Sequence, residues 1–299
     1  MNDKGYNPEV ISLDNNIIIK NIEDFDLKET LECGQCFHFL NTEESNNNYT
    51  YLISSFNRGL KIEQKNGDLI FHDTTVDEYN SIWKEYFDLD RDYKSIKKEI
   101  GDASPELMDI IEKNNGIRLL NQDFFETLIS FIISQNNQIP RIKKLVNDIS
   151  EKWGSKSFSY IDNIYNFPDA GTMDKVTEEE LRELKTGFRA PYIVDAVSRF
   201  NSGEINEEEL RQADTAECEK KLCIIRGVGN KVANCVMLFS LGKRDSFPID
   251  VWMKRVLEQV YFNGEEKSKE YLFDFSKDKF GSLGGYAQQY LFAFARGIR

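Results

Sequence analysis

The stretch from Cys223 to Gly242, CIIRGVGNKVANCVMLFSLG, contains a tight glycine turn between two segments of helical character. The turn itself is Gly227-Val228-Gly229. Glycine leaves backbone N–H groups unobstructed by a Cβ atom, and the N-terminus of the following helix adds partial positive charge. Together these features predict an anion site that suits one phosphate group. A glycine turn is also a common connection between two helices, and that simpler interpretation stays open at this point.

The turn is followed at once by Lys231, and almost every residue of the next ten is apolar. A lysine amine in such a half-buried place can act as a nucleophile and form a Schiff base. The simpler alternative is a lysine that extends from the helix end to solvent. Asp250 follows nineteen residues later, just before a helix expected over 251–260. It could cap that helix, or face Lys231 and both stabilise positive charge on a sugar and manage the proton of the amine.

The overall composition indicates an ordered globular protein, with 299 residues, 40% hydrophobic residues and a net charge of -13. No run of 18 apolar residues is present, so no membrane span is expected. The N-terminus, MNDKGYNPEV, lacks a signal peptide pattern, which predicts a cytoplasmic location. Acidity alone argues against nucleic acid as a partner. The segment 220–256, however, holds eight cations and two acids, which could form either a cationic face at the glycine turn or an ordinary solvated face.

The order of patterns along the chain predicts an α+β protein. Residues up to about 90 are rich in strand formers, and Asn66-Gly67 is a strong hairpin signal. From about 78 onward apolar residues recur every three or four positions, as in amphipathic helices. We therefore expect a β-rich domain over residues 1–104 and a helical domain over residues 105–299.

The five cysteines do not suggest a disulfide framework, because their number is odd and they are sparse. Cys33 and Cys36 form a C-x-x-C pair, which could be a redox dithiol or half of a zinc site. A second such pair is missing from the sequence, and its only histidines are His38 and His72. A thiol or zinc function is therefore disfavoured.

Several segments together resemble the 8-oxoguanine DNA glycosylase/AP lyase family of the helix-hairpin-helix glycosylase superfamily. The resemblance extends over roughly residues 22 to 298, and its motifs occur in the order of the family. It implies an antiparallel N-terminal sheet and a two-lobed helical domain. The matching segments are LECGQCFHF (31–39), GIRLLNQDFFETLISFIISQNNQIPRI (116–142), GFRAPYI (187–193), LCIIRGVGNKVANCV (222–236) with FPIDV (247–251), and GGYAQQYLFAFAR (284–296).

The resemblance implies an enzyme that excises 8-oxoguanine, best opposite cytosine, and then cleaves the strand. Lys231 would attack C1′ of the damaged nucleotide and expel the base, and Asp250 would stabilise the oxocarbenium-like transition state. Gly34 would accept a hydrogen bond from N7–H, a group that 8-oxoguanine has and guanine lacks. Cys235 and Phe292 would sandwich the flipped base, and Gln288 would read its Watson–Crick edge.

The resemblance also implies contacts to the rest of the duplex. Asn136 would fill the gap left by the flipped base, and Arg141 and Arg189 would bind the orphaned cytosine. Phe188 would wedge beside that cytosine, and Gly227, Val228 and Gly229 would hold a phosphate. The expected partner is double-stranded DNA containing 8-oxoguanine, with no membrane, and the protein is expected to be a monomer, associated with the nucleoid if bacterial.

Some positions depart from the pattern of the family. Trp252 replaces a histidine and Ala295 an acidic residue, at positions expected to help contact phosphate and tie the active site together. Gln135 replaces a serine, Glu32 a proline, and His38-Phe39 an arginine-tryptophan pair. The cysteine signature of an iron–sulfur cluster does not follow Asp250, so neither a cluster nor another required cofactor is expected. A structural cation could be held by the hairpin carbonyls of Cys223, Ile225 and Val228.

Two other functions stay open from the residues alone. An alkylated-base DNA glycosylase would not need Lys231 or the Gly34 acceptor. A non-catalytic helix-hairpin-helix DNA-binding module would need neither Lys231 nor Asp250.

Overall fold

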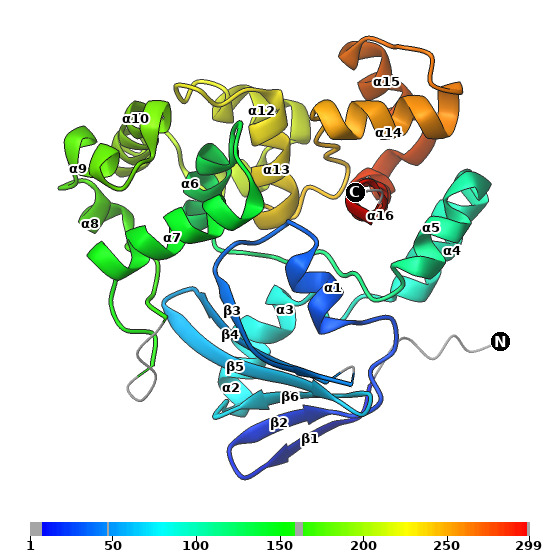
Figure 1. Ribbon diagram of the computed structural model, residues 1–299, viewed down its shortest axis with the longest axis horizontal. Coiled ribbons are helices and arrows are strands. Elements are labelled where there is room, and N and C mark those ends of the chain that lie inside the picture. The colour runs from blue at the N-terminus through cyan, green and yellow to red at the C-terminus, as the bar shows by residue number, and fades with distance from the viewer. Residues whose placement is uncertain (1–7, 47, 159–163, 298–299) are drawn as a thin grey trace.

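The N-terminal part of the chain forms one antiparallel sheet. The computed structural model describes residues 8–46, 48–158 and 164–297. The strand order is β1-β2-β6-β5-β4-β3, and all neighbouring strands are antiparallel (Figure 1). The strands are β1 (Val10–Leu13), β2 (Asn16–Ile19), β3 (Phe39–Ser45), β4 (Asn48–Ser55), β5 (Arg58–Lys65) and β6 (Asp68–His72).

Two-residue turns with left-handed backbone connect three of the strand pairs. Asn66-Gly67 joins β5 to β6 with φ values of 52° and 85°, so the predicted hairpin is confirmed. Asp14-Asn15 and Phe56-Asn57 make the same kind of turn between β1 and β2 and between β4 and β5. Positive φ at both turn residues matches the right-handed twist of the flanking strands, which keeps each hairpin in register.

Helices make up the rest of the molecule, and the expected order of a sheet followed by helices is confirmed. Figure 1 shows α6 to α13 grouped on one side, and α4, α5 and α14 to α16 on the other. The helices are α1 (Leu27–Glu32), α2 (Val76–Glu78), α3 (Lys84–Tyr86), α4 (Tyr93–Ala103), α5 (Met108–Lys113), α6 (Phe124–Ser134), α7 (Ile139–Trp153), α8 (Ala170–Met173), α9 (Glu178–Glu183), α10 (Ala190–Asn201), α11 (Glu207–Gln212), α12 (Thr215–Leu222), α13 (Asn230–Ser240), α14 (Val251–Phe262), α15 (Lys269–Phe280) and α16 (Gly284–Gly297).

Two apolar cores hold these elements together. The smaller core lies between the sheet and the short helices α1 and α3, while the larger one fills the helical part. Tyr93, Ile96 and Ile100 of α4 belong to the larger core, although α4 precedes the expected domain boundary at residue 104. The boundary itself stays a prediction. Within the described ranges, no helix combines the length and the apolar character that a bilayer crossing requires.

Candidate active site

A cavity of about 600 Å³ opens where the loop after α1 meets α6, α7, α13, α14 and α16. It continues into an inner recess of about 40 Å³, and both are lined by Gly34, Phe131 and Phe292. All six residues predicted to act on the damaged nucleotide line the recess: Gly34, Lys231, Cys235, Asp250, Gln288 and Phe292.

Lys231 lies in the first turn of α13 with its amine inside the cavity. The glycine turn ends at Gly229, which is the N-cap residue of this helix. The amine lies 5.2 Å from the ring centroid of Phe131, a distance at which an ammonium group is attracted to an aromatic face. Burial raises the pKa of the neighbouring Cys235 thiol, and the Lys231 charge partly offsets that rise. The amine is therefore held over a cavity wall rather than extended to solvent.

Asp250 occupies the N-cap position of α14. Its Oδ1 accepts a hydrogen bond of 2.8 Å from the backbone N–H of Met253, so the predicted cap is confirmed. Asp250 lines the cavity together with Lys231, and in the described part of the chain no ion pair joins the two. A reacting group can therefore be placed between the carboxylate and the amine.

The remaining walls of the recess offer hydrogen-bonding groups to a ligand. Gly34 has a φ of 95°, a left-handed conformation that favours glycine. The side-chain oxygen of Gln288 is buried and has no hydrogen-bond partner among the described residues. A buried acceptor without a partner costs free energy, and a donor on a bound ligand would relieve that cost. The recess is thus suited to a ligand that carries a hydrogen-bond donor.

The residues predicted to fill the gap in the duplex and to bind the orphaned cytosine lie near the end of α6. Asn136 has a φ of 47°, and the guanidinium of Arg189 donates to its carbonyl at 3.0 Å. Arg189 also donates to the carbonyls of Gln135 and Thr186, and it is buried. It therefore holds the Asn136 turn in this structure. A contact from Arg189 to an orphaned base stays a prediction, and it would require these bonds to exchange. Arg141 is exposed, and its guanidinium donates a hydrogen bond to the carbonyl of Lys185.

Phe188 and the glycine turn form one continuous surface through Tyr192. Phe188 is 47% exposed and its ring makes an edge contact with Tyr192, with 6.0 Å between centroids. Gly227 has a φ of 79°, and a Cβ atom there would lie 2.3 Å from the Tyr192 ring. Gly229 has open space around it. The sequence did not single out Tyr192, although it lies in the GFRAPYI segment.

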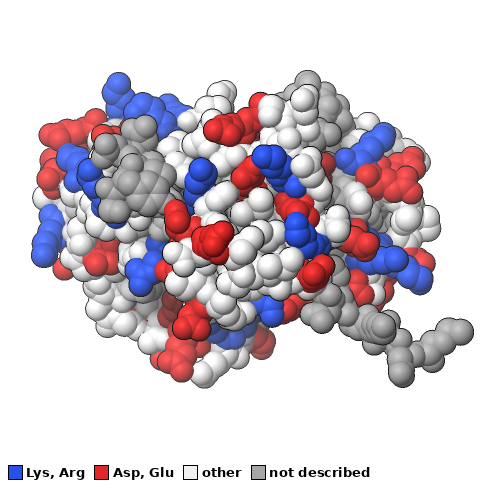
Figure 2. All heavy atoms as spheres, turned by 90° about the horizontal axis from the view of Figure 1, so that it is seen from below, with Lys and Arg blue, Asp and Glu red and all other residues white. Residues whose placement is uncertain are grey.

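The predicted cationic face is smaller than the sequence count suggested. Lys221 and Lys254 form ion pairs with glutamates, and Lys243 and Arg244 donate to carbonyl groups. Half of the eight cations in segment 220–256 are thus engaged within the protein. Figure 2 shows the sheet side of the molecule, where the cations and acids of the described residues are interspersed.

The thiol and zinc interpretations find no support in the structure. Cys33 and Cys36 are buried, are not joined by a disulfide, and their thiols contact the carbonyls of Thr30 and Leu31. Burial raises the pKa of Cys36 well above its usual value, which disfavours the reactive thiolate. In the ranges that the structure describes, no cluster of three or more histidine, cysteine or acidic residues could bind a metal ion.

Two of the residues that depart from the family pattern lie at the cavity. Trp252 and Ala295 both line the outer cavity, and Trp252 is 45% exposed with the Arg255 guanidinium over its ring at 5.2 Å. His38 makes a buried contact of 2.8 Å with Glu126. The rings of Phe131 and Phe239, which line the recess, were not identified from the sequence because they belong to long apolar runs.

Two family models together match most of the chain. The 8-oxoguanine DNA glycosylase N-terminal domain matches residues 17–128, and the HhH-GPD superfamily base excision DNA repair protein matches residues 129–280. A solved structure of Clostridium acetobutylicum 8-oxoguanine glycosylase/lyase, bound to double-stranded DNA with cytosine opposite 8-oxoguanine, is 39% identical. It aligns with a TM-score of 0.91 over 97% of this chain and 98% of that one.

Curated relatives match over shorter stretches. A probable N-glycosylase/DNA lyase of Methanothermobacter thermautotrophicus is 29% identical over 62% of this chain and 65% of its own length. The N-glycosylase/DNA lyase OGG1 of Arabidopsis thaliana is 36% identical over 50% of this chain. The match spans 42% of the length of that relative.

Proposed function

Because this chain belongs to the 8-oxoguanine DNA glycosylase family within the HhH-GPD superfamily of base excision DNA repair proteins, we propose that it excises 8-oxoguanine from double-stranded DNA and then cleaves the abasic strand. The observation that carries the proposal is the convergence on one recess of a lysine amine, a carboxylate and the residues expected to bind the base. These residues come from segments far apart in the sequence.

Lys231 provides the nucleophile. Its uncharged amine attacks C1′, the bond from C1′ to the base breaks, and the base leaves with the bonding electrons and takes up a proton. Opening of the sugar ring then gives a Schiff base between Nζ and C1′. Loss of a C2′ proton breaks the C3′–O3′ bond, which cuts the strand 3′ to the lesion, and water releases the enzyme. Asp250 stabilises positive charge on the sugar as the base leaves.

The base is recognised by the walls of the recess. The Gly34 carbonyl accepts the N7–H of 8-oxoguanine, and it would be left unpaired against the bare N7 of guanine. The unpartnered oxygen of Gln288 accepts a donor on the Watson–Crick edge. Cys235 and Phe292 lie on the two faces of the flipped base.

The duplex is held on both sides of the lesion. Asn136 fills the gap, Phe188 wedges into the stack, and Arg141 with Arg189 recognises the opposite cytosine. The turn from Gly227 to Gly229 binds a phosphate through its backbone N–H groups.

The enzyme works in the cytoplasm as a monomer, associated with the nucleoid in a bacterial cell, and needs no cofactor for the reaction. A structural cation fits the hairpin carbonyls of Cys223, Ile225 and Val228. The Ile225 carbonyl accepts one hydrogen bond of 3.0 Å from the Val228 N–H, which leaves a lone pair for a cation.

Borohydride trapping tests the mechanism directly. The protein is mixed with duplexes that contain 8-oxoguanine opposite each of the four bases, and the reductant converts a Schiff base into a stable adduct. We expect an adduct with the wild type, most of it opposite cytosine, and none with Lys231→Gln. The matched control is Lys98→Gln, because Lys98 is 76% exposed on α4, lies outside segment 220–256, and should trap as the wild type does. An adduct of undiminished yield with Lys231→Gln would overturn the proposed nucleophile.

A further inference from the structure

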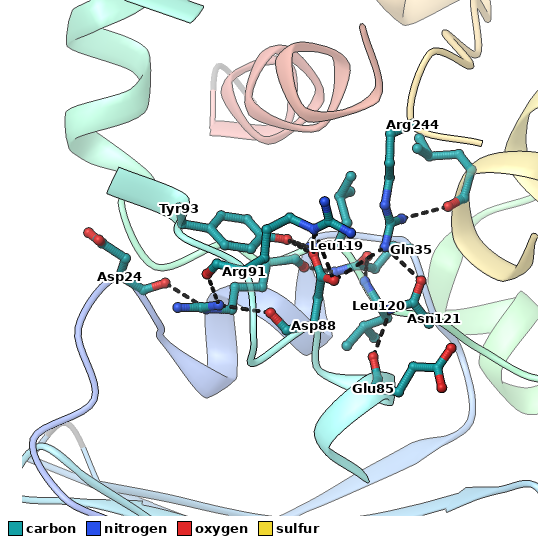
Figure 3. A network of polar contacts seen from close by, with 12 residues as sticks. Asp24, Gln35, Glu85, Asp88, Arg91, Tyr93, Leu119, Leu120, Asn121 and Arg244 are labelled. Atoms are coloured by element: carbon teal, nitrogen blue, oxygen red, sulfur yellow. Dashed lines mark hydrogen bonds and ion pairs between the residues drawn. The ribbon is translucent and has the colours of Figure 1, made fainter. Parts of the chain in front are cut away.

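Gln35, the residue next to Gly34, is fixed by hydrogen bonds to two separate segments of main chain. Its side chain is 0% exposed. Its Nε2 donates to the carbonyls of Thr30 at 2.7 Å and Arg118 at 2.8 Å, and its Oε1 accepts from the Leu120 N–H at 2.9 Å. Figure 3 shows Gln35 beside Leu119 and Leu120. The loop that carries the Gly34 carbonyl is therefore attached to segment 118–122.

Gln122 continues this connection to the helix of the nucleophile. Its Nε2 donates to the Gln35 carbonyl at 2.7 Å, and its own N–H donates to the carbonyl of Phe239 at 2.8 Å, near the end of α13. Phe239 lines the recess, and its ring stacks on Phe131 with 5.5 Å between centroids. The Lys231 amine lies over that same Phe131 ring. We call Gln35 and Gln122 the glutamine clasp.

Segment 118–122 is itself anchored on both sides, as Figure 3 shows for Asn121. Asn121 donates to the Glu85 carbonyl at 2.7 Å and accepts from the Arg244 guanidinium at 2.6 Å. Arg118 is completely buried and donates to the Asp88 carbonyl at 2.9 Å. Because the segment cannot shift easily, the clasp fixes the distance between the Gly34 loop and α13.

We propose that Gln35 and Gln122 are positioning residues that set the discrimination between 8-oxoguanine and guanine. This inference rests on the proposed function, in which one hydrogen bond from N7–H to the Gly34 carbonyl separates the two bases. A hydrogen bond tolerates little change in distance or angle, so the carbonyl must be held still to accept that bond. It must also be held still to stay unpaired against guanine, because a mobile carbonyl could turn away from the bare N7.

The test measures binding of three duplexes by two clasp variants. Gln35→Met keeps the length of the side chain without its hydrogen bonds, and Gln122→Ala removes only the bond to the Gln35 carbonyl. Both are made with Lys231→Gln so that no DNA is cut. The duplexes carry 8-oxoguanine, guanine or a tetrahydrofuran abasic analogue opposite cytosine. We expect the preference for 8-oxoguanine over guanine to fall about tenfold, which corresponds to about 1.4 kcal/mol, with abasic-analogue affinity within about twofold of that of the parent.

Gln64 offers a matched control. It is 8% exposed in β5, accepts from the Leu27 N–H at 2.7 Å and donates to the Phe25 carbonyl at 3.1 Å, away from the recess. Gln64→Met should lower the melting temperature without changing base preference. If Gln35→Met does not fold, Gln122→Ala provides the test. The Gln122 side chain is only half-buried, so its truncation should disturb the fold less.

Two results would overturn the clasp: an unchanged base preference in the clasp variants, or an equal loss of affinity for all three duplexes. Failure of the proposed function itself would look different, because the Lys231→Gln parent would then show no preference for 8-oxoguanine.

Discussion

Asp250 shows how one side chain can serve both the fold and the chemistry. One carboxylate oxygen caps α14, and the other stays outside that bond while the residue lines the cavity. Both tasks require a short acidic side chain at the start of a helix, so the sequence predicts the residue without separating its roles. Substitution can separate them, because asparagine caps a helix about as well as aspartate but carries no charge.

We expect Asp250→Asn to slow base excision at least about 100-fold while the melting temperature changes little. Asp250→Ala should show the same slow excision and also lose about 1 kcal/mol of stability, because it removes the cap. Single-turnover excision and thermal unfolding measure the two effects. Asp214→Asn is the control, since Asp214 caps α12 by the same bond to the N–H of Glu217 at 2.8 Å. Excision at the wild-type rate by Asp250→Asn would remove its catalytic role.

Other residues of the site could not be identified from the sequence. Phe131 lies in the apolar run FFETLISFIIS, in which nothing local shows which ring faces a cavity. Gln35 lies in a short loop after α1, and its partners at Arg118 and Leu120 lie more than 80 positions away. Contacts between distant segments leave no periodic signal.

At the scale of elements, helix starts were predictable because their signals are local. Thr177 and Glu180 form a capping box at α9, and Asn206 caps α11, and both helices begin with three glutamates. Asp123 caps α6 by accepting a hydrogen bond from the backbone N–H of Glu126. Its burial, however, depends on the packing of α6 inside the larger core, which the sequence does not show.

Burial of Asp123 predicts a specific pH dependence of stability. Burial, more than the nearby Glu126 and Glu207 charges, raises the pKa of Asp123 to about 6 in the folded state. Its ionisation then opposes folding, by about 3 kcal/mol at most above pH 6 and by nothing below about pH 4. Asp123→Asn keeps the cap and should be more stable than the wild type at pH 7, with a gain that disappears as the pH falls to 4. Urea unfolding of both proteins at several pH values measures this difference in the free energy of unfolding.

Asp92→Asn provides a control of opposite sign for that experiment. Hydrogen bonds from the Ser95 side chain and N–H lower the pKa of Asp92, the exposed cap of α4. The ionised form of Asp92 therefore stabilises the folded state at pH values above the pKa that Asp92 has in the unfolded chain. This stabilisation is lost as the pH falls through the pKa that Asp92 has in the folded protein. Asp92→Asn should therefore be less stable than the wild type at pH 7. A pH-independent effect of Asp123→Asn would contradict the raised pKa.

At the scale of the whole molecule, the order of sheet and helices was predictable but the electrostatics were not. A formal count gave segment 220–256 a surplus of six positive charges, yet a count cannot show which cations are neutralised by folding. Lys254 reaches Glu258 at 2.6 Å and Glu266 at 3.1 Å. Arg226 instead is exposed beside the glycine turn, with its guanidinium 5.7 Å from the Tyr192 ring centroid.

This difference predicts a modest salt dependence of DNA binding. Each phosphate that a cation neutralises contributes about -0.9 to the slope of log affinity against log salt. With about three or four cations free for phosphate, we expect a slope near about -3, well short of the value of about -7 for eight contacts. Arg226→Gln should reduce the magnitude of this slope by about one, whereas Lys254→Met should leave the slope unchanged, because Lys254 already pairs with two glutamates.

Fluorescence anisotropy between about 50 and 300 mM salt measures the slope. A slope near zero, or one that falls equally in both variants, would show that the cations at the turn do not face the duplex.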